Sequence, residues 1–431
     1  MLSVEEALDR VLTAVPVLGT EVIPLPDALG RALAEPIDST RDLPPWPNSS
    51  MDGYAVRSDD LQGAEVSRPV RLRVVGEIPA GAVAQRPLRG GESYRILTGA
   101  PLPPGADAVV PQEEVERDGD QLGVARPAAP GAYVRPRGED IRAGDRVLEP
   151  GTTLGPAALA VLAALGRPVV RVYRTPRVAV LSTGDELVDI GTVPGPGQIP
   201  NSNSYALGAL VRASRAHLQD LGIARDDPDA IEARLRAGLA ADVLVSSAGV
   251  SVGDRDFVRE ALDRLGARVD FWKVSMRPGK PMTFALIGNG GTARAGASAA
   301  GPSERADRPF FGLPGNPVSC MVTFELFVRP ALRRMGGYRV IHPPRVRARA
   351  GEAIDNPGPR RGYLRVQLAG PPERLTARPT GEQGSGILRS MLLADGLAVV
   401  APDTRIAPGE PVEVILLRDE GLGGVRDDGG A

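Results

Sequence analysis

The middle of the chain alternates short apolar runs with longer helical patterns, and this alternation constrains the fold more than any other feature. Apolar runs of strand length occur at Val178–Leu181, Val243–Val245 and 268–274. Helical patterns at 229–240 and 256–265 precede the last two of these runs. Strands that alternate with helices of this length are typical of a largely parallel sheet that is covered by helices on both faces.

The flanking segments have a different pattern. A chain of 431 residues is too long for one hydrophobic core, so we expect about two to four domains. Short apolar runs alternate with Gly/Pro turns from Met51 to about Val134 and again from about Arg345 to Leu417, which predicts two β-rich domains. The proline-rich segment Leu43–Pro47 cannot be helical and is predicted to be an extended hinge. Pro156–Leu165 is predicted to be a helix that Gly166 ends.

Two segments are predicted to be disordered. Gly288–Pro309 is rich in Ala, Gly, Ser and Arg and interrupts the central α/β domain as an insertion. Residues 419–431 form a Gly-rich and Asp-rich tail at the end of the chain.

Charge and composition exclude several classes of protein. The formal net charge of −2 gives no basis for nucleic-acid binding, which usually needs a basic face. No apolar run approaches the roughly 20 residues of a membrane-spanning helix. The N-terminal residues lack the basic-then-apolar order of a signal peptide. A single cysteine, Cys320, excludes an internal disulfide framework, so we expect a reducing, cytoplasmic location.

Histidine is also scarce. The two histidines, His217 and His342, lie neither in Gly-rich turns nor beside another residue of ligand type. A Ser-His-Asp triad and a histidine-bearing zinc site are therefore not expected. Any metal would be held by oxygen ligands, which favours Mg²⁺ over zinc or copper.

Lysine is almost absent. Of 51 basic residues only Lys273 and Lys280 are lysines, and both lie within one short stretch. An ammonium group is a compact point charge, whereas a guanidinium group is a wide planar fork, so a tight oxyanion pocket can require lysine. Chance survival of two codons is the alternative. The functional interpretation is favoured for Lys280, which lies in a Gly-Pro turn, and the two interpretations are about equal for Lys273.

Polar loops that contain glycine follow the predicted strands of the central domain. They are Ser182–Glu186, Ser246–Asp256 and Leu313–Ser319, and Met276–Pro281 forms a separate basic turn. Because ligands bind beyond the C-terminal ends of the strands in open α/β sheets, we expect these loops to meet in one site. Each loop alone is also explained by the glycines and capping residues that strand-to-helix turns need.

Together these loops supply backbone N–H groups, hydroxyls, carboxylates and cations. This combination predicts a phosphorylated, anionic substrate held at helix N-termini, with Mg²⁺ bridging it to carboxylates. Glu186 and Asp256 are the best metal-ligand candidates. Asp226 is a third, although a helix cap before Pro228 explains it nearly as well.

Polar motifs also occur outside the central domain. Asp52 lies within Asn48–Ala55, where Met and Tyr suggest a carboxylate held rigidly against apolar packing. Thr98 and Asp140 occupy tight turns of the predicted β-rich domain. A surface turn could use the same residues.

In combination, the motifs resemble those of the molybdopterin molybdenumtransferases, the family of MoeA and of the E domain of gephyrin. The resemblance covers nearly the whole chain, from Ala28 to about Leu417. The motifs that carry it, in chain order, are Asn48–Ala55, Thr98–Pro101, Pro104–Val110, Gly138–Asp140, Ser182–Leu187, Gly249–Asp256, Pro278–Pro281, Leu313–Ser319, Gly384–Gly386, Ser390–Met391 and Ala394–Gly396.

The resemblance implies a homodimer of four-domain subunits. Residues 1–44 and 142–176 would form a discontinuous, mixed domain for dimerisation, and residues 45–141 a β-rich domain. Residues 177–334 would be the parallel α/β, molybdopterin-binding domain, and residues 335–418 a barrel-like β domain. The active site would lie between the α/β domain of one subunit and the β-rich domain of the other.

The resemblance also implies the reaction. Members of this family take adenylated molybdopterin and molybdate, hydrolyse the adenylate with Mg²⁺, and insert molybdenum into the dithiolene. The products are molybdenum cofactor and AMP. A molybdopterin adenylyltransferase and maturation factors of molybdenum enzymes are the implied protein partners.

Residue roles follow from the matching motifs. Glu186 and Asp256 would serve the metal and phosphate region. The molybdate pocket would be formed by Arg277, Lys280, Ser319, Arg365 and Ser390. Further substrate contacts are implied for Ser182, Thr183, Gly184, Gly249, Ser251, Pro314, Gly315 and Ser385. The residues that approach from the second subunit would be Asp52, Thr98 and Asp140. The acid that orients the hydrolytic water would be Asp226, Asp256 or Asp52.

Two alternatives remain open. An adenylyltransferase that acts one step earlier is related to the α/β domain alone, and residues 1–175 and 335–420 argue against it. A scaffold descended from this fold is disfavoured by the intact acids and Lys280. Ala248 stands where the family usually has glycine, which leaves the geometry of that loop open. The sequence does not indicate whether molybdate or tungstate is preferred.

Overall fold

The computed structural model describes residues 1–248, 257–288 and 307–417. The chain forms two compact units. The first contains residues 1–34, 150–155 and the chain from 170 onward, and the second contains residues 35–149 and 156–169.

A six-stranded sheet forms the centre of the first unit. In sheet order its strands are β16 (His217–Ala224), β13 (Arg177–Thr183), β17 (Val243–Ser247), β21 (Arg308–Leu313), β20 (Pro281–Ile287) and β18 (Ala267–Lys273). The pairs from β16 to β21 are parallel, whereas β20 is antiparallel to both of its neighbours. The predicted, largely parallel sheet is therefore confirmed, with β20 as the departure.

The sequence patterns do not identify β16 or β20. β16 is an edge strand in which Gly222 has a positive φ of 74°, so its apolar residues do not alternate regularly. β20 is a short, mostly buried run that directly follows the Met276–Pro281 turn, and periodicity alone cannot separate such a run from a loop or a helix.

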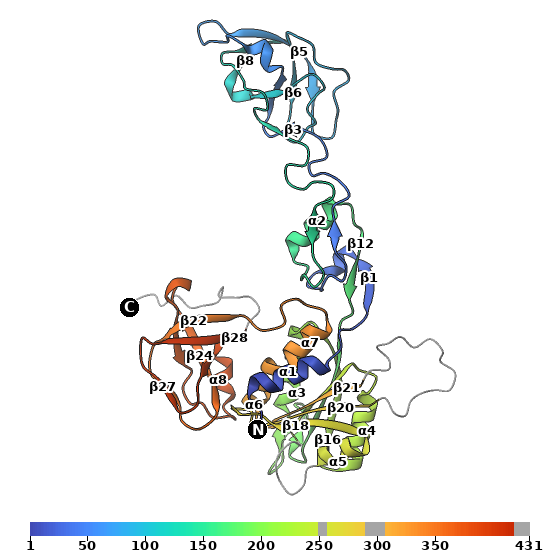
Figure 1. The fold of residues 1–431 in the computed structure, drawn as a ribbon, viewed down its shortest axis with the longest axis vertical. Coiled ribbons are helices and arrows are strands. Elements are labelled where there is room, and N and C mark those ends of the chain that lie inside the picture. The colour runs from blue at the N-terminus through green and yellow to red at the C-terminus, as the bar shows by residue number, and fades with distance from the viewer. Residues whose placement is uncertain (249–256, 289–306, 418–431) are drawn as a thin grey trace, which may run out of the picture. The chain divides into compact units, whose positions relative to one another are not determined.

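Helices cover both faces of this sheet, as predicted. On one face, α4 (Pro228–Gly238) and α5 (Phe257–Arg264) share a hydrophobic core with the strands. The helices of the other face belong to a second core and are α1 (Val4–Ala14), α3 (Ser202–Ala213), α6 (Pro317–Thr323) and α7 (Arg329–Met335), with a π-helical turn, Phe324–Val328, between the last two. Figure 1 shows α4 and α5 on the side of the sheet away from α1.

The C-terminal part of the first unit is a closed five-stranded barrel, which confirms the predicted barrel-like β domain. Pairing runs from β24 through β25, β22, β28 and β26 and returns to β24. The strands are β22 (Arg345–Ala350), β24 (Arg361–Ala369), β25 (Thr376–Pro379), β26 (Gly396–Val400) and β28 (Pro411–Leu416). The short strand β19 (Met276–Arg277) pairs with β24 and so ties the barrel to the α/β domain.

The N-terminal helix α1 begins at a capping box. The Ser3 hydroxyl accepts a hydrogen bond from the backbone N–H of Glu6 at 3.1 Å, and the Glu6 carboxylate accepts one from the N–H of Ser3 at 2.8 Å. These bonds satisfy two N–H groups that would otherwise lack partners at a helix start.

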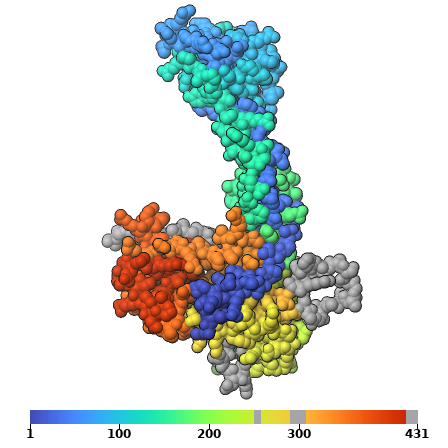
Figure 2. All heavy atoms as spheres, viewed as in Figure 1, coloured from blue at the N-terminus to red at the C-terminus, as the bar shows by residue number. Residues whose placement is uncertain are grey.

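Helix α1 packs against both the α/β domain and the barrel. Val11 of α1 and Leu397 of β26 belong to the same hydrophobic core. The Glu5 carboxylate pairs with Arg361 of β24, and Arg10 pairs with Asp270 of β18 at 3.0 Å. Figure 2 shows this helix in blue between the orange-red barrel and the yellow α/β domain.

The second unit contains the predicted β-rich domain. Its six-stranded sheet has the order β7 (Ala108–Pro111), β4 (Gly53–Val56), β6 (Glu92–Ile96), β5 (Val70–Ile78), β9 (Gln121–Val124) and β8 (Val115–Asp118). Short apolar runs between Gly/Pro turns, as predicted from Met51 to about Val134, account for these strands. The predicted helix at Pro156–Leu165 is α2 (Pro156–Ala164).

The remaining elements are short. They are β1 (Thr20–Pro24) with β12 (Val169–Tyr173), β2 (Ile37–Asp38) with β11 (Arg146–Leu148), β3 (Asn48–Ser49) with β10 (Val134–Arg135), β14 (Leu187–Val188) with β15 (Ile199–Pro200), β23 (Ile354–Asn356) with β27 (Thr404–Ile406), α8 (Leu388–Leu392), and the 3₁₀ turns Leu25–Ala28, Ser58–Leu61, Gln112–Glu114 and Pro372–Arg374.

The two predicted disordered segments fall mostly outside the described residues. Only the ends of the Gly288–Pro309 segment are described, and the prediction is wrong at one of them, because Arg308 and Pro309 belong to β21. The predicted tail, residues 419–431, lies entirely outside the described residues.

Replacement of Phe284 should strongly destabilise the first unit. Its ring is fully buried and lies 5.8 Å from that of Phe271 and 5.1 Å from that of Phe311. We expect Phe284→Ala to lower the free energy of unfolding by about 3–5 kcal/mol, measured from the urea midpoint by circular dichroism. Val193, which is 90% exposed, provides the control, and Val193→Ala should change it by less than about 0.5 kcal/mol. Equal effects of the two substitutions would contradict this assignment of the core.

Candidate active site

The strand ends of the central sheet meet at one edge, as the loop pattern predicts. Thr183 is in register with Ala224, Ser182 with Ser247, and Ser247 with Leu313. Because β20 runs antiparallel, it begins at this same edge. Lys280, the residue before β20, therefore lies beside the C-terminal ends of the parallel strands.

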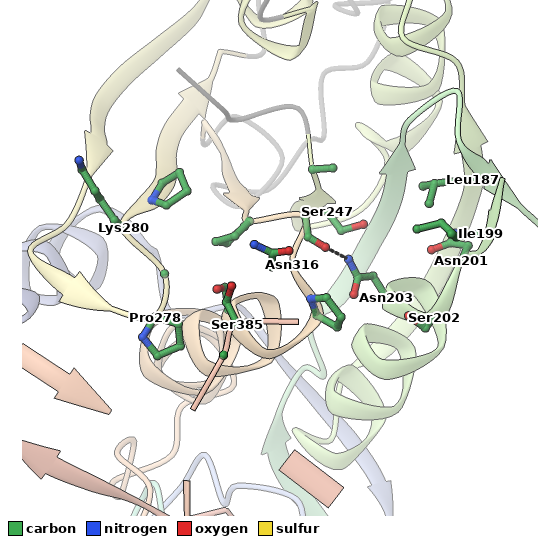
Figure 3. A pocket seen from close by; sticks show the side chains of 18 of the residues that line it. Leu187, Ile199, Asn201, Ser202, Asn203, Ser247, Pro278, Lys280, Asn316 and Ser385 are labelled. Atoms are coloured by element: carbon green, nitrogen blue, oxygen red, sulfur yellow. Dashed lines mark hydrogen bonds between the residues drawn. The ribbon is translucent and has the colours of Figure 1, made fainter. Parts of the chain in front are cut away.

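A cavity of about 830 Å³ lies at this edge. The predicted site residues that line it are Glu186, Arg277, Lys280, Pro314, Gly315, Ser319 and Ser385. Its walls come from both the α/β domain and the barrel. In Figure 3, Leu187 and Lys280 lie at opposite ends of the cavity, and the amino end of Lys280 is directed away from Ser247 and Asn316.

Arg365 and Ser390 lie behind the barrel wall of this cavity. Arg365, on β24, is fully buried, and its Nε donates to the Ser390 hydroxyl at 3.0 Å. Its Nη2 donates to the carbonyl oxygen of Gly384 at 3.0 Å, next to the cavity-lining Ser385. Its Nη1 has no hydrogen-bond partner in the described part of the chain.

The charge of Arg365 is not balanced. Its side-chain partners among the described residues are a hydroxyl and backbone carbonyl oxygens, and none is a carboxylate. Burial, together with the positive charge of Arg277, lowers the pKa of Arg365 to about 10. A buried guanidinium group that is destabilised in this way favours a bound oxyanion beside it.

The loop after β13 contains a glycine in a backbone conformation that other residues rarely adopt. Gly184 has a φ of +147°, and a Cβ there would lie 2.5 Å from a carboxylate oxygen of Glu186. The two residues before Gly184 carry buried hydroxyls. The Ser182 hydroxyl accepts a hydrogen bond from the Ser247 hydroxyl at 3.1 Å, and the Thr183 hydroxyl has no partner among the described residues. The glycine allows the Glu186 carboxylate to fold back over the strand end.

Three carboxylates gather beside this loop. The backbone N–H of Asp226 donates to Asp185 Oδ1 at 3.2 Å. Burial raises the pKa of Asp226, and the negative charges of Asp185 and Glu186 raise it further. A cation would relieve this repulsion. Within residues 1–248, 257–288 and 307–417, however, no group of three potential ligands is placed to hold a metal ion.

Three predicted residues, Gly249, Ser251 and Asp256, lie outside the described residues. Asp256 is one of the two predicted metal ligands, so the described site contains Glu186 without that partner.

Comparison with known proteins gives one consistent family. The chain matches the MoeA N-terminal region (domain I and II) over residues 2–166, the probable molybdopterin binding domain over 179–334, and the MoeA C-terminal region (domain IV) over 347–417. It is 39% identical to the molybdopterin molybdenumtransferase of Nostoc sp., with 97% of this chain and 94% of that protein covered. This chain belongs to the molybdopterin molybdenumtransferase family.

Two further comparisons agree with this family. The Haemophilus influenzae molybdopterin molybdenumtransferase is 34% identical, with 96% of this chain and 98% of that protein covered. The molybdopterin biosynthesis MoeA protein of Pyrococcus horikosii, a crystal structure, is 34% identical with a TM-score of 0.79, and 97% of this chain and 99% of that chain are covered.

These matches confirm the predicted family and a transferase role in molybdenum cofactor biosynthesis. The matches at both ends of the chain argue against an adenylyltransferase related to the α/β domain alone. Among the described residues, no helix is both long and apolar enough to cross a membrane.

Ala248, which stands where the family usually has glycine, has an unusual backbone conformation. Ala248 has a positive φ of 73°, a conformation that glycine adopts more easily. A Cβ on Gly315 would lie 3.2 Å from the Cβ of Ala248, so Gly315 leaves the space that this alanine needs. The molybdopterin molybdenumtransferase fold thus accommodates alanine at this position without a clash.

The predicted residues of the second unit are only partly brought together. Asp52 Oδ1 accepts hydrogen bonds from the backbone N–H and the hydroxyl of Thr98, both at 2.7 Å. These bonds hold the pKa of Asp52 below its usual value. Asp140 lies in a separate turn, where its N–H donates to the carbonyl oxygen of Leu43 at 3.0 Å.

Sequence reasoning missed several cavity-lining residues. Asn203, in the first turn of α3, donates to the carbonyl oxygen of Gly315 at 2.7 Å and so fixes the loop after β21. Arg360 and Gln383 enter from the barrel. Asn203 could have been noticed from its position just after the helix cap Asn201, but no local signal identifies the two barrel residues.

The raised pKa of Asp226 predicts a pH-dependent stability. The folded state binds the proton more tightly than the unfolded chain, so ionisation of Asp226 at neutral pH weakens folding. We expect Asp226→Asn to raise the thermal unfolding midpoint at pH 7, and the gain should disappear as the pH falls below about 4. Asp227, which caps α4 through Ala230 N–H at 2.8 Å, is the control. Asp227→Ala should lower the thermal unfolding midpoint at pH 7. A lower midpoint for Asp226→Asn as well would contradict the repulsion of Asp226 by Asp185 and Glu186.

Proposed function

We propose that the chain hydrolyses adenylated molybdopterin and inserts molybdenum from molybdate into its dithiolene, releasing AMP. The observation that supports this proposal is the division of charge in the cavity. Glu186 lines the cavity next to Leu187, and Arg277 and Lys280 line it from the Met276–Pro281 turn. Figure 3 shows Leu187 and Lys280 at opposite ends of the cavity. A substrate with a phosphate to be cleaved and an oxyanion to be bound needs both kinds of site.

Glu186 in the cavity lining and the acids beside it fit a divalent cation. Asp185, Glu186 and Asp226 repel one another, and carboxylates are the ligands that Mg²⁺ prefers. We propose Glu186 and Asp256 as its ligands. Asp226 is available either as a further ligand or as the acid that orients the hydrolytic water. Bound Mg²⁺ would neutralise phosphate charge during hydrolysis. The choice among Asp226, Asp256 and Asp52 as the acid that orients this water stays a prediction.

The cations of the cavity suit a tetrahedral dianion. Lys280 carries a point charge on a flexible stem at the cavity, and Ser319 and Ser385 offer hydroxyls. Arg365 has an N–H group without a partner among the described residues, and it holds Ser390 and the carbonyl oxygen of Gly384 in place. In this proposal molybdate occupies the region between Lys280 and the barrel wall.

We further propose a homodimer whose active site receives Asp52, Thr98 and Asp140 from the second subunit. Helix α2 supports this proposal, because its sequence is entirely apolar while only Leu162 is buried. A helix that is hydrophobic all round is normally covered on all sides. A second copy of the chain is the partner that the family suggests for the exposed apolar surface of α2.

A cytoplasmic location agrees with the proposed chemistry. The single cysteine, Cys320, is buried and free, and its burial raises the pKa of its thiol to about 12. An adenylyltransferase would supply the substrate, and maturation factors of molybdenum enzymes would accept the product.

Lys280→Ala tests the oxyanion role. We expect the molybdate concentration for half-maximal AMP release to rise by about tenfold or more, because a charge-assisted hydrogen bond is lost. The other lysine, Lys273, is exposed and does not line the cavity, so Lys273→Ala should leave this concentration unchanged. An unaltered molybdate dependence in Lys280→Ala would remove the role. A scaffold would release no AMP from adenylated molybdopterin, and an adenylyltransferase would make the adenylate instead.

Mixed dimers test the shared site. Asp52→Ala and Glu186→Ala subunits should each be inactive alone, because each lacks one half of the proposed site. After the two are mixed and allowed to exchange, about a quarter to a half of native AMP release should return, since one of the two sites in a heterodimer is intact. Mixing Asp52→Ala with Asp52→Ala labelled by a different tag is the control. No recovery in a verified heterodimer would place each site within one chain.

A further inference from the structure

Arg360 has a defined position at the junction of the barrel and the α/β domain. It immediately precedes β24, whose first residues pair with β19, with Arg361 opposite Met276 and Gly362 opposite Arg277. This pairing fixes the backbone of Arg360 beside the turn that leads to Lys280. Arg360 is half-buried and lines the cavity.

The side chain of Arg360 crosses from the barrel to the α/β domain. Its Nη1 donates to the carbonyl oxygen of Met276 at 3.2 Å. In the opposite direction, Nη1 of Arg277 donates to the carbonyl oxygen of Pro357 at 3.2 Å. Each arginine is therefore anchored on the other domain by one hydrogen bond, and most of its N–H groups remain for a ligand.

The charge of Arg360 has no partner in the described part of the chain. Its neighbour Arg361 pairs with Glu5, and many other arginines pair with carboxylates, but no carboxylate within salt-bridge distance faces Arg360. Among the described residues that line the cavity, Arg277, Lys280 and Arg360 are cationic, and only Glu186 is anionic. Three cations held around one partly enclosed space repel one another unless an anion joins them.

We infer that Arg360 is a further oxyanion-binding residue of this cavity, at its barrel wall. The inference rests on the proposed function and adds a residue to it. A guanidinium group with free parallel N–H groups fits a tetrahedral dianion in a bidentate manner, and two chemical groups of the proposed reaction have this form. They are molybdate and the phosphate monoester of AMP.

The test measures binding of both oxyanions to the full-length chain. Isothermal titration with sodium molybdate and, separately, with AMP and Mg²⁺ would compare the native chain with Arg360→Gln and Arg360→Lys. Arg361→Gln is the matched control, because Arg361 is adjacent, carries the same charge and pairs with Glu5 outside the cavity lining. Thermal unfolding without ligand would be measured for all four proteins.

We expect Arg360→Gln to weaken binding of one of the two probes by about tenfold or more, and the affected probe identifies which oxyanion Arg360 contacts. Arg360→Lys should recover part of the affinity, because the charge returns without the planar fork. Arg361→Gln should leave both affinities within about twofold of the native values and should lower only the unfolding midpoint.

Two outcomes would overturn the inference, and they are distinguishable. If Arg360→Gln binds both probes like the native chain and only its unfolding midpoint falls, Arg360 is merely a link between the domains, and the proposed function is unaffected. If the native chain itself binds neither molybdate nor AMP, the proposed function fails, and the role of Arg360 fails with it.

Discussion

The active-site cavity depends on one continuous hydrophobic core that joins three parts of the chain. Residues of α1, of the α/β domain and of the outer face of the barrel belong to it, for example Val11, Phe284 and Leu397. Because the cavity has walls from both the α/β domain and the barrel, its shape is fixed only while this core holds the domains together. Apolar packing, rather than the polar residues, therefore sets the distances between the charged groups.

The direction of each strand determines at which edge of the sheet its charged residues lie. The parallel strands deliver their acids and hydroxyls to one edge, and the antiparallel β20 delivers Lys280 to the same edge from its beginning. The β19–β24 pairing then brings in arginines from the barrel. Glu186, Arg277, Lys280 and Arg360 thus line one cavity, where a bound substrate can contact both kinds of charge.

Much of the fold and part of the site can be predicted from the sequence. Strand-end loops with glycine, such as the one that holds Gly184 and Glu186, are local signals. The scarcity of lysine draws attention to Lys273 and Lys280, and the Gly-Pro turn favours Lys280. Arg360 and the direction of β20 cannot be predicted in this way, because they depend on pairings between distant segments. The approach of Asp52 to the cavity stays a prediction, because it depends on a second copy of the chain.

The docking of α1 also has a consequence for biosynthesis. Leu2 forms a bridge with Val274, and Glu5 pairs with Arg361, so α1 binds residues that are made much later. At about 5–20 residues per second, α1 waits for tens of seconds with its apolar face uncovered. During that interval an amphipathic segment is a target for chaperones or for aggregation. The first unit therefore cannot be completed until the barrel strand that carries Arg361 has been made.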